Sequence, residues 1–117
     1  MTFPLELAPE AESDIDDILE WSASQFGGAI RNGYEALLDA AIRSIQEDPD
    51  RPGSRERSEL GRGIRSLHLT SSRTAVGDGA RKIARPRHFI VYRQDGEVIQ
   101  VLRVPHDAMD LPTQRMR

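Results

Sequence analysis

The spacing of apolar residues changes from a helical to a strand period near residue 63, and this change restricts the fold more than any other feature. Between residues 29 and 46 the apolar positions follow one helical face: Ile30, Tyr34, Leu37, Leu38, Ala41, Ile42 and Ile45. After residue 63 apolar and polar residues alternate, as they do in strands. A chain of 117 residues buries one core rather than two. Helices and strands must therefore pack on each other in one domain.

The N-terminal half predicts a short strand followed by a helical hairpin. Residues 3–7 alternate, and Pro4 predicts an edge strand or a strand beginning, because proline cannot donate to a ladder. Pro9 suits the first position of a helix, and helical spacing continues as far as Phe26. Gly27-Gly28 predicts a tight turn into the second helix, at residues 29–46.

The C-terminal half predicts three strands, at residues 63–69, 87–93 and 98–104. Asp95-Gly96 between the last two predicts a hairpin. Residues 47–63 predict a polar loop, and residues 70–84 a long hairpin loop or frayed strand ends. The order β-α-α-β-β-β predicts an α+β fold with the helical hairpin on one face of an antiparallel sheet. We expect one domain over residues 1–117, with a flexible tail at 112–117.

Charge is divided between the two halves. Residues 1–50 carry 12 acidic and 2 basic residues, a net charge of −10, and residues 51–117 carry 7 acidic and 14 basic residues, a net charge of +7. All but one of the bases are arginine, which recognises phosphate or carboxylate groups bidentately. This asymmetry indicates either a charged partner or an acidic helical surface that complements a basic sheet.

Several classes of function find no support. The chain has no cysteine, which excludes disulfides and thiolate metal sites and fits a cytoplasmic protein. No apolar run is long enough to span a membrane, and no secretory signal is recognisable. The three histidines lie on three different predicted elements without metal-ligand spacing, so we expect neither a metal nor a cofactor. Phosphate-binding loops and nucleophile elbows are likewise not recognisable.

The basic sheet is the remaining candidate for chemistry. Along residues 87–93 the alternation places His88 and Tyr92 on one face and Arg87 and Arg93 on the other. Arg65 belongs to the neighbouring predicted strand. A sheet face with arginine and histidine could bind RNA or carry out acid–base chemistry. The alternative is that these arginines are solvated or pair with the acidic helices.

Two segments resemble a known family. The strand Arg87-His88-Phe89-Ile90-Val91-Tyr92-Arg93 is one, and the other is the ending Leu102-Arg103-Val104-Pro105-His106-Asp107-Ala108-Met109-Asp110. Together with the β-α-α-β-β-β order and the leading Leu7-Ala8-Pro9-Glu10-Ala11, they resemble the RelE/ParE toxin superfamily of bacterial toxin–antitoxin systems. Within it the chain is similar to the ParE toxins, over about residues 3–111.

The resemblance implies a non-enzymatic toxin that inhibits DNA gyrase and replication by protein–protein contact. It implies neutralisation by a cognate ParD-like antitoxin in a hetero-oligomer, with no membrane partner and no specific DNA binding by the toxin alone. We expect the target-binding residues to be Arg65, Arg87, Arg93, Arg103, His106, Met109 and Asp110. We expect the antitoxin-binding residues to be Ile15, Leu19, Trp21, Phe26, Tyr34 and Leu38.

Two alternatives remain open. In a RelE-like endoribonuclease that cleaves mRNA, the catalytic residues would be Arg65, His88, Arg103 and His106. The arginines would hold the phosphate, and a histidine would be the acid or base. The resemblance implies that a RelE-like ribonuclease often carries a tyrosine in its tail, and this tail has none. A net acidic chain is also poorly suited to binding RNA, so both features favour the gyrase inhibitor. The second alternative is a toxin fold that has lost its activity and only binds its antitoxin.

Overall fold

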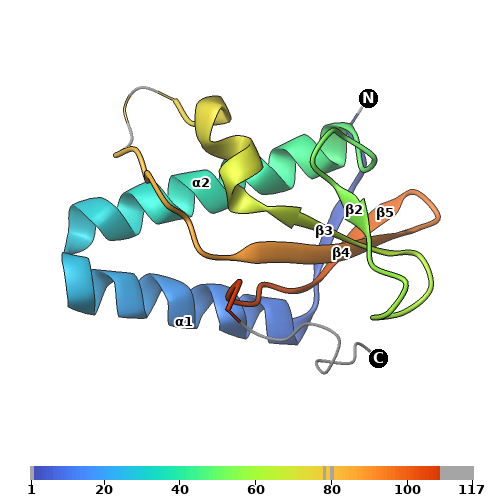
Figure 1. The fold of residues 1–117 in the computed structure, drawn as a ribbon, viewed down its shortest axis with the longest axis horizontal. Coiled ribbons are helices and arrows are strands. Elements are labelled where there is room, and N and C mark those ends of the chain that lie inside the picture. Colours follow the sequence, from blue (N-terminus) through green and yellow to red (C-terminus); the bar gives the residue numbers. More distant parts are fainter. Residues whose placement is uncertain (1, 78, 80, 109–117) are drawn as a thin grey trace.

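The structure, a computed structural model, describes residues 2–77, 79 and 81–108. It contains the predicted elements in the predicted order, with two short additions (Figure 1). The elements are β1 (Leu5–Leu7), α1 (Pro9–Phe26), α2 (Gly28–Glu47), β2 (Arg55–Glu56), β3 (Ile64–His68), the 3-10 helix η1 (Leu69–Ala75), β4 (Phe89–Asp95) and β5 (Val98–Arg103). The predicted α+β fold class is therefore confirmed.

The five strands form one mixed sheet in the order β1-β5-β4-β3-β2. Strands β3, β4 and β5 pair antiparallel, as predicted, and β2, which was not predicted, pairs antiparallel with β3. Strand β1 instead runs parallel to β5, with Leu5 opposite Ile99. A parallel pair needs a long connection, and here the helical hairpin and the other strands supply it. As Pro4 predicts, β1 is an edge strand, and the proline only accepts a hydrogen bond, from Ile99 N to its carbonyl oxygen.

The main core lies between the helical hairpin and one face of the sheet. Figure 1 shows α1 and α2 antiparallel and joined at one end. Leu37 and Ile45 of α2 pack against Leu67, Ile90 and other fully buried strand residues. A smaller cluster on the opposite sheet face consists of Leu60, Ile64, Val91, Phe89 and Leu102. The predicted alternation is thus confirmed for residues 89–92, with both faces of β4 covered. The strand itself begins at Phe89 and ends at Asp95, two residues later than predicted, so Arg87 and His88 precede it and line the same hollow.

Two regions differ from the sequence prediction. The polar loop at 47–63 contains β2, whose two exposed residues give no strand signal. Leu69 was predicted to end a strand and residues 70–84 to form a long loop or frayed strand ends. Residues 69–75 instead form η1, in which Leu69 and Ser72 are buried and His68 Nδ1 accepts a hydrogen bond from Thr70 N. Within the described residues, no helix is long and apolar enough to cross a membrane. The tail predicted at 112–117 lies outside them.

Candidate functional site

An apolar groove runs between the C-terminal half of α1, the start of α2 and residues 83–88. It has a volume of about 430 Å³. Trp21 and Phe26 of α1 form one wall; they are 56% and 60% exposed, and their rings meet edge to face with centroids 5.5 Å apart. Ile30 and Ile83 line the groove as well. Large aromatic side chains this exposed around a hollow are typical of surfaces that bind a partner.

The polar floor of the groove is a hydrogen-bonded pair, Tyr34 and His88. The Tyr34 hydroxyl oxygen accepts from Arg87 N at 3.0 Å, so its own proton is directed at His88 Nδ1, 2.6 Å away. Burial is the main cause that lowers the pKa of His88 to about 4, and the neighbouring His106 contributes less. Burial raises the pKa of Tyr34 to about 12. Both groups are therefore neutral at pH 7 and hold the groove floor in place.

Asp107 connects the residues around one end of the groove. Its carboxylate accepts from His68 Nε2 at 3.1 Å and from Arg87 Nε at 3.0 Å. Burial tends to raise the pKa of Asp107, but the hydrogen bonds from His68 and Arg87 outweigh it and hold this pKa below its ordinary value. His106 stacks edge to face on His88, with centroids 5.1 Å apart. The sequence prediction did not include Asp107 among the site residues, although it follows His106 in the segment 102–110 that resembles the toxin family.

Arg103 is bound to α1 rather than free for a ligand. Its Nε and Nη2 donate to the two carboxylate oxygens of Asp14, at 2.8 and 3.1 Å. The register between β4 and β5 shifts by one residue beside it, which leaves Val104 N outside the ladder. That amide donates to Asp14 Oδ2 at 2.9 Å. Asp14 thus raises the pKa of Arg103 and anchors the end of β5 to α1.

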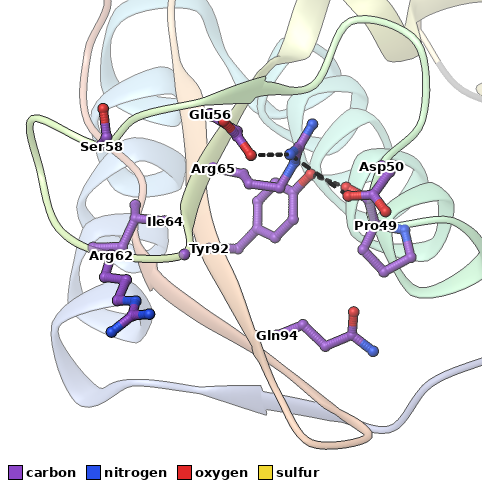
Figure 2. Close-up of a pocket in the computed structure, with 10 residues that line it drawn as sticks. Pro49, Asp50, Glu56, Ser58, Arg62, Ile64, Arg65, Tyr92 and Gln94 are labelled. Carbon is purple, nitrogen blue, oxygen red and sulfur yellow. Dashed lines mark hydrogen bonds and ion pairs between the residues drawn. The ribbon is translucent and has the colours of Figure 1, made fainter.

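Arg65 lies in a second hollow, of about 340 Å³, under the loop that follows α2. Figure 2 shows its guanidinium group between the carboxylates of Glu56 and Asp50. The Nη1 atom lies 3.7 and 3.6 Å from those carboxylates, and Nε donates to Ser54 Oγ at 2.8 Å. Ser54 Oγ in turn hydrogen-bonds the hydroxyl of the buried Tyr92. Arg65 therefore fastens this loop to the sheet.

The four residues of the ribonuclease hypothesis are not brought together. His88 and His106 are adjacent and pair across an isolated bridge. Arg103 is near that end of the sheet but is bound by Asp14, while Arg65 lies opposite Tyr92, further along β4. Among the described residues, no three or more histidine or acidic side chains are grouped to hold a metal ion.

The predicted partner-binding residues separate into three groups. The groove is lined by Trp21, Phe26 and Tyr34 from the antitoxin set and by Arg87 and His106 from the target set. Met109 and Asp110 lie outside the described residues. The others lie elsewhere: Leu19 and Leu38 in the core, Ile15 half-buried against it, Arg65 and Arg103 in internal pairs, and Arg93 bound to Gln100 on the far sheet face.

Comparison with known proteins identifies the class. The sheet and helical hairpin match those of solved bacterial toxin–antitoxin structures. One is described as the chromosomal ParDE TA system from P. aeruginosa, with a TM-score of 0.64 and 17% identity over 90% of this chain and 96% of that chain. Another is the toxin–antitoxin complex RelBE2 from Mycobacterium tuberculosis, with a TM-score of 0.53 and 20% identity over 91% and 99%. These likenesses show a shared fold. Since residues 5–111 also match a family model of type II toxins, the chain is a type II toxin of the RelE/ParE superfamily, whose partner is an antitoxin.

Sequence comparison identifies the family. Residues 5–111 match the model described as the ParE toxin of the type II toxin–antitoxin system, parDE, and the chain belongs to this family. It is 28% identical over 107 residues to Toxin ParE1 of Caulobacter vibrioides, which covers 92% of each chain. The family resemblance predicted from the sequence is confirmed.

Proposed function

We propose that this toxin inhibits DNA gyrase in the cytoplasm by protein–protein contact and is neutralised by a ParD-like antitoxin. The observation that carries the proposal is the contrast between two arginines of the sheet, Arg65 and Arg103, and the apolar groove. Arg65 and Arg103 are bound to internal acceptors, whereas Trp21 and Phe26 are exposed around a hollow. Such a surface suits a protein partner more than a phosphodiester substrate.

The alternative ribonuclease lacks an assembled acid–base site. Cleavage of RNA requires positive charge at the phosphate and a group that exchanges protons near neutral pH. His88 is neutral, with a pKa of about 4, and its Nδ1 already faces the Tyr34 hydroxyl. Of the other residues proposed for this chemistry, Arg65 and Arg103 are paired with acidic side chains, and His106 Nδ1 accepts a hydrogen bond from Ala108 N at 3.0 Å. The toxin therefore acts without a catalytic step.

The antitoxin occupies the apolar groove through an amphipathic helix. A helix with apolar residues on one face suits a groove lined by Trp21, Phe26 and Ile83. Arg87 and His106 line the same groove, so a bound antitoxin also covers part of the expected target surface. Neutralisation then follows from competition: gyrase and antitoxin cannot contact Arg87 and His106 at the same time.

Supercoiling of relaxed plasmid by purified gyrase tests the target. We expect wild-type toxin to inhibit and Arg87→Ala/His106→Ala to inhibit about ten-fold less, because two contacts at the groove end are lost. Arg43→Ala/Arg55→Ala, which removes two exposed arginines elsewhere, should inhibit like wild type. Thermal unfolding of each variant checks that the fold is retained, since Arg87 also binds Asp107. Undiminished supercoiling at a large excess of wild-type toxin would refute gyrase as the target.

Primer extension on translated mRNA tests the alternative. We expect no toxin-dependent cuts in cells that express the toxin without its antitoxin. Cuts that disappear in a His106→Ala variant would replace the gyrase proposal with the ribonuclease.

A further inference from the structure

A basic hollow of about 560 Å³ lies beside the apolar groove, between α2, η1 and residues 81–84. It is lined by three cationic and two hydroxyl side chains: Arg73, Arg81, Lys82, Thr70 and Thr74. Within the described part of the chain, none of these three cations is in an ion pair. The hollow therefore presents concentrated positive charge that the described structure leaves without a counter-charge.

Two contacts connect the walls of the basic hollow. Figure 1 shows η1 above α2, and the chain that follows, coloured yellow to orange, passing α2 on its way to β4. A Cβ atom on Gly33 of α2 would overlap the backbone carbonyl oxygen of Arg81, so glycine lets residues 81–84 lie directly on the helix. Lys82 Nζ donates to Val76 O at 2.6 Å, which ties this segment to the residue after η1. Arg81 and Lys82 therefore lie against α2 and beside the end of η1.

The groove and the basic hollow lie on either side of Ile83, and we call residues 83–87 the ridge between them. Ile83 lines both, and Arg85 and Arg87 line the groove just beyond it. The sequence around the ridge is one-sided in charge, because residues 60–94 contain eight basic residues and one acidic residue, Asp78. A partner whose apolar residues fill the groove and whose chain continues over Ile83 enters a field of positive charge.

We propose that the basic hollow binds an acidic stretch of the antitoxin, next in its sequence to the amphipathic helix that fills the groove. The proposal rests on the proposed function, since it takes the antitoxin as the occupant of the groove. Carboxylate side chains suit the guanidinium groups of Arg73 and Arg81 and the threonine hydroxyls. The apolar groove supplies most of the affinity, and the basic hollow supplies fast association and selects an acidic partner.

Titration of full-length toxin with its cognate antitoxin tests this inference through two signals. Trp21 is the only tryptophan of the chain. If the antitoxin used contains no tryptophan, the fluorescence of Trp21 reports whether the groove is filled. The affinity is measured at several salt concentrations. The test variant is Arg73→Ala/Arg81→Ala, which leaves Lys82 and its hydrogen bond intact. The matched control is Arg43→Ala/Arg55→Ala, with the same change in charge at exposed positions away from the groove.

We expect the test variant to bind about ten-fold more weakly at low salt, with the difference from wild type nearly lost at about 0.5 M salt. The fluorescence of Trp21 should respond as in wild type once the antitoxin saturates the toxin, and the control should bind like wild type.

Equal affinity of test variant and wild type at low salt would overturn the inference while leaving the groove assignment intact. A Trp21 signal that does not respond to bound antitoxin would instead refute the groove assignment. If the variant keeps its antitoxin affinity but loses affinity for a DNA oligonucleotide, the basic hollow serves phosphate and the inference is wrong.

Discussion

Replacing Asp14 should detach the end of β5 from α1 and destabilise the fold. The Asp14 carboxylate accepts three hydrogen bonds, two from the Arg103 guanidinium and one from Val104 N, at 2.8 to 3.1 Å. Asp14→Ala leaves both donors without this acceptor. Arg103 is about one-third exposed, so water replaces much of what it loses. Val104 N lies beside a fully buried strand end and has no ladder partner to fall back on.

These contacts give a magnitude. A hydrogen bond from an amide to a charged acceptor contributes about 1.5 kcal/mol, and a partly solvated ion pair about 1 kcal/mol. We therefore expect Asp14→Ala to lower the free energy of unfolding by about 2–3 kcal/mol. For a chain of this size the midpoint of thermal unfolding should fall by about 10 °C. Asp14→Asn keeps one acceptor oxygen and should lose about half as much free energy.

Equilibrium unfolding in urea measures this difference. Asp16→Ala is the matched control, because it removes the same charge from an exposed position two residues further along α1. The control should change stability by less than about 0.5 kcal/mol. If Asp14→Ala is no less stable than Asp16→Ala, the link between α1 and β5 contributes nothing, and the reasoning from these hydrogen bonds is wrong.

Three further predictions concern the groove and its ridge. Gly33→Ala should lower stability by about 1–3 kcal/mol in urea unfolding despite alanine's better helix propensity, because the new methyl group overlaps the Arg81 carbonyl. Tyr34→Phe should lower the free energy of unfolding by about 1–2 kcal/mol, because His88 Nδ1 and Arg87 N lose their partner. Stability should also fall as pH drops from about 6.5 to about 4. The pKa of His88 is about 4 in the fold against 6.5 ordinarily, so the unfolded chain binds more protons in that window. His88→Gln should flatten that dependence in unfolding curves measured across this pH range.

The helices and most strands were predictable because their signals are local. Pro9 and Gly27 mark the ends of α1, and the Asp95-Gly96 turn fixes the last hairpin, where Gly96 has a φ of 63°. The parallel pairing of β1 with β5 was not predictable in this way. It joins Leu5 to Ile99 across most of the chain, and alternation within a three-residue strand does not specify a partner or a direction.

The candidate site was only partly predictable, because internal ion pairs depend on distant partners. The sequence showed that Arg65 and Arg103 belong to strands, but not that Asp50 and Asp14 would bind them. It also suggested a division between an antitoxin-binding helical hairpin and a target-binding sheet. The groove instead brings Trp21 and Arg87 together, because residues 83–88 pack beside α1 before β4 begins.

Supercoiling by purified gyrase, with toxin alone and with the toxin–antitoxin complex, decides whether gyrase is the target of this toxin. We expect the toxin alone to inhibit supercoiling in proportion to its concentration. We also expect a stoichiometric amount of antitoxin to restore the activity, because an antitoxin bound in the groove would cover Arg87 and His106, which line it. Full supercoiling in the presence of excess free toxin would contradict the account, and so would inhibition that persists when every toxin molecule carries antitoxin.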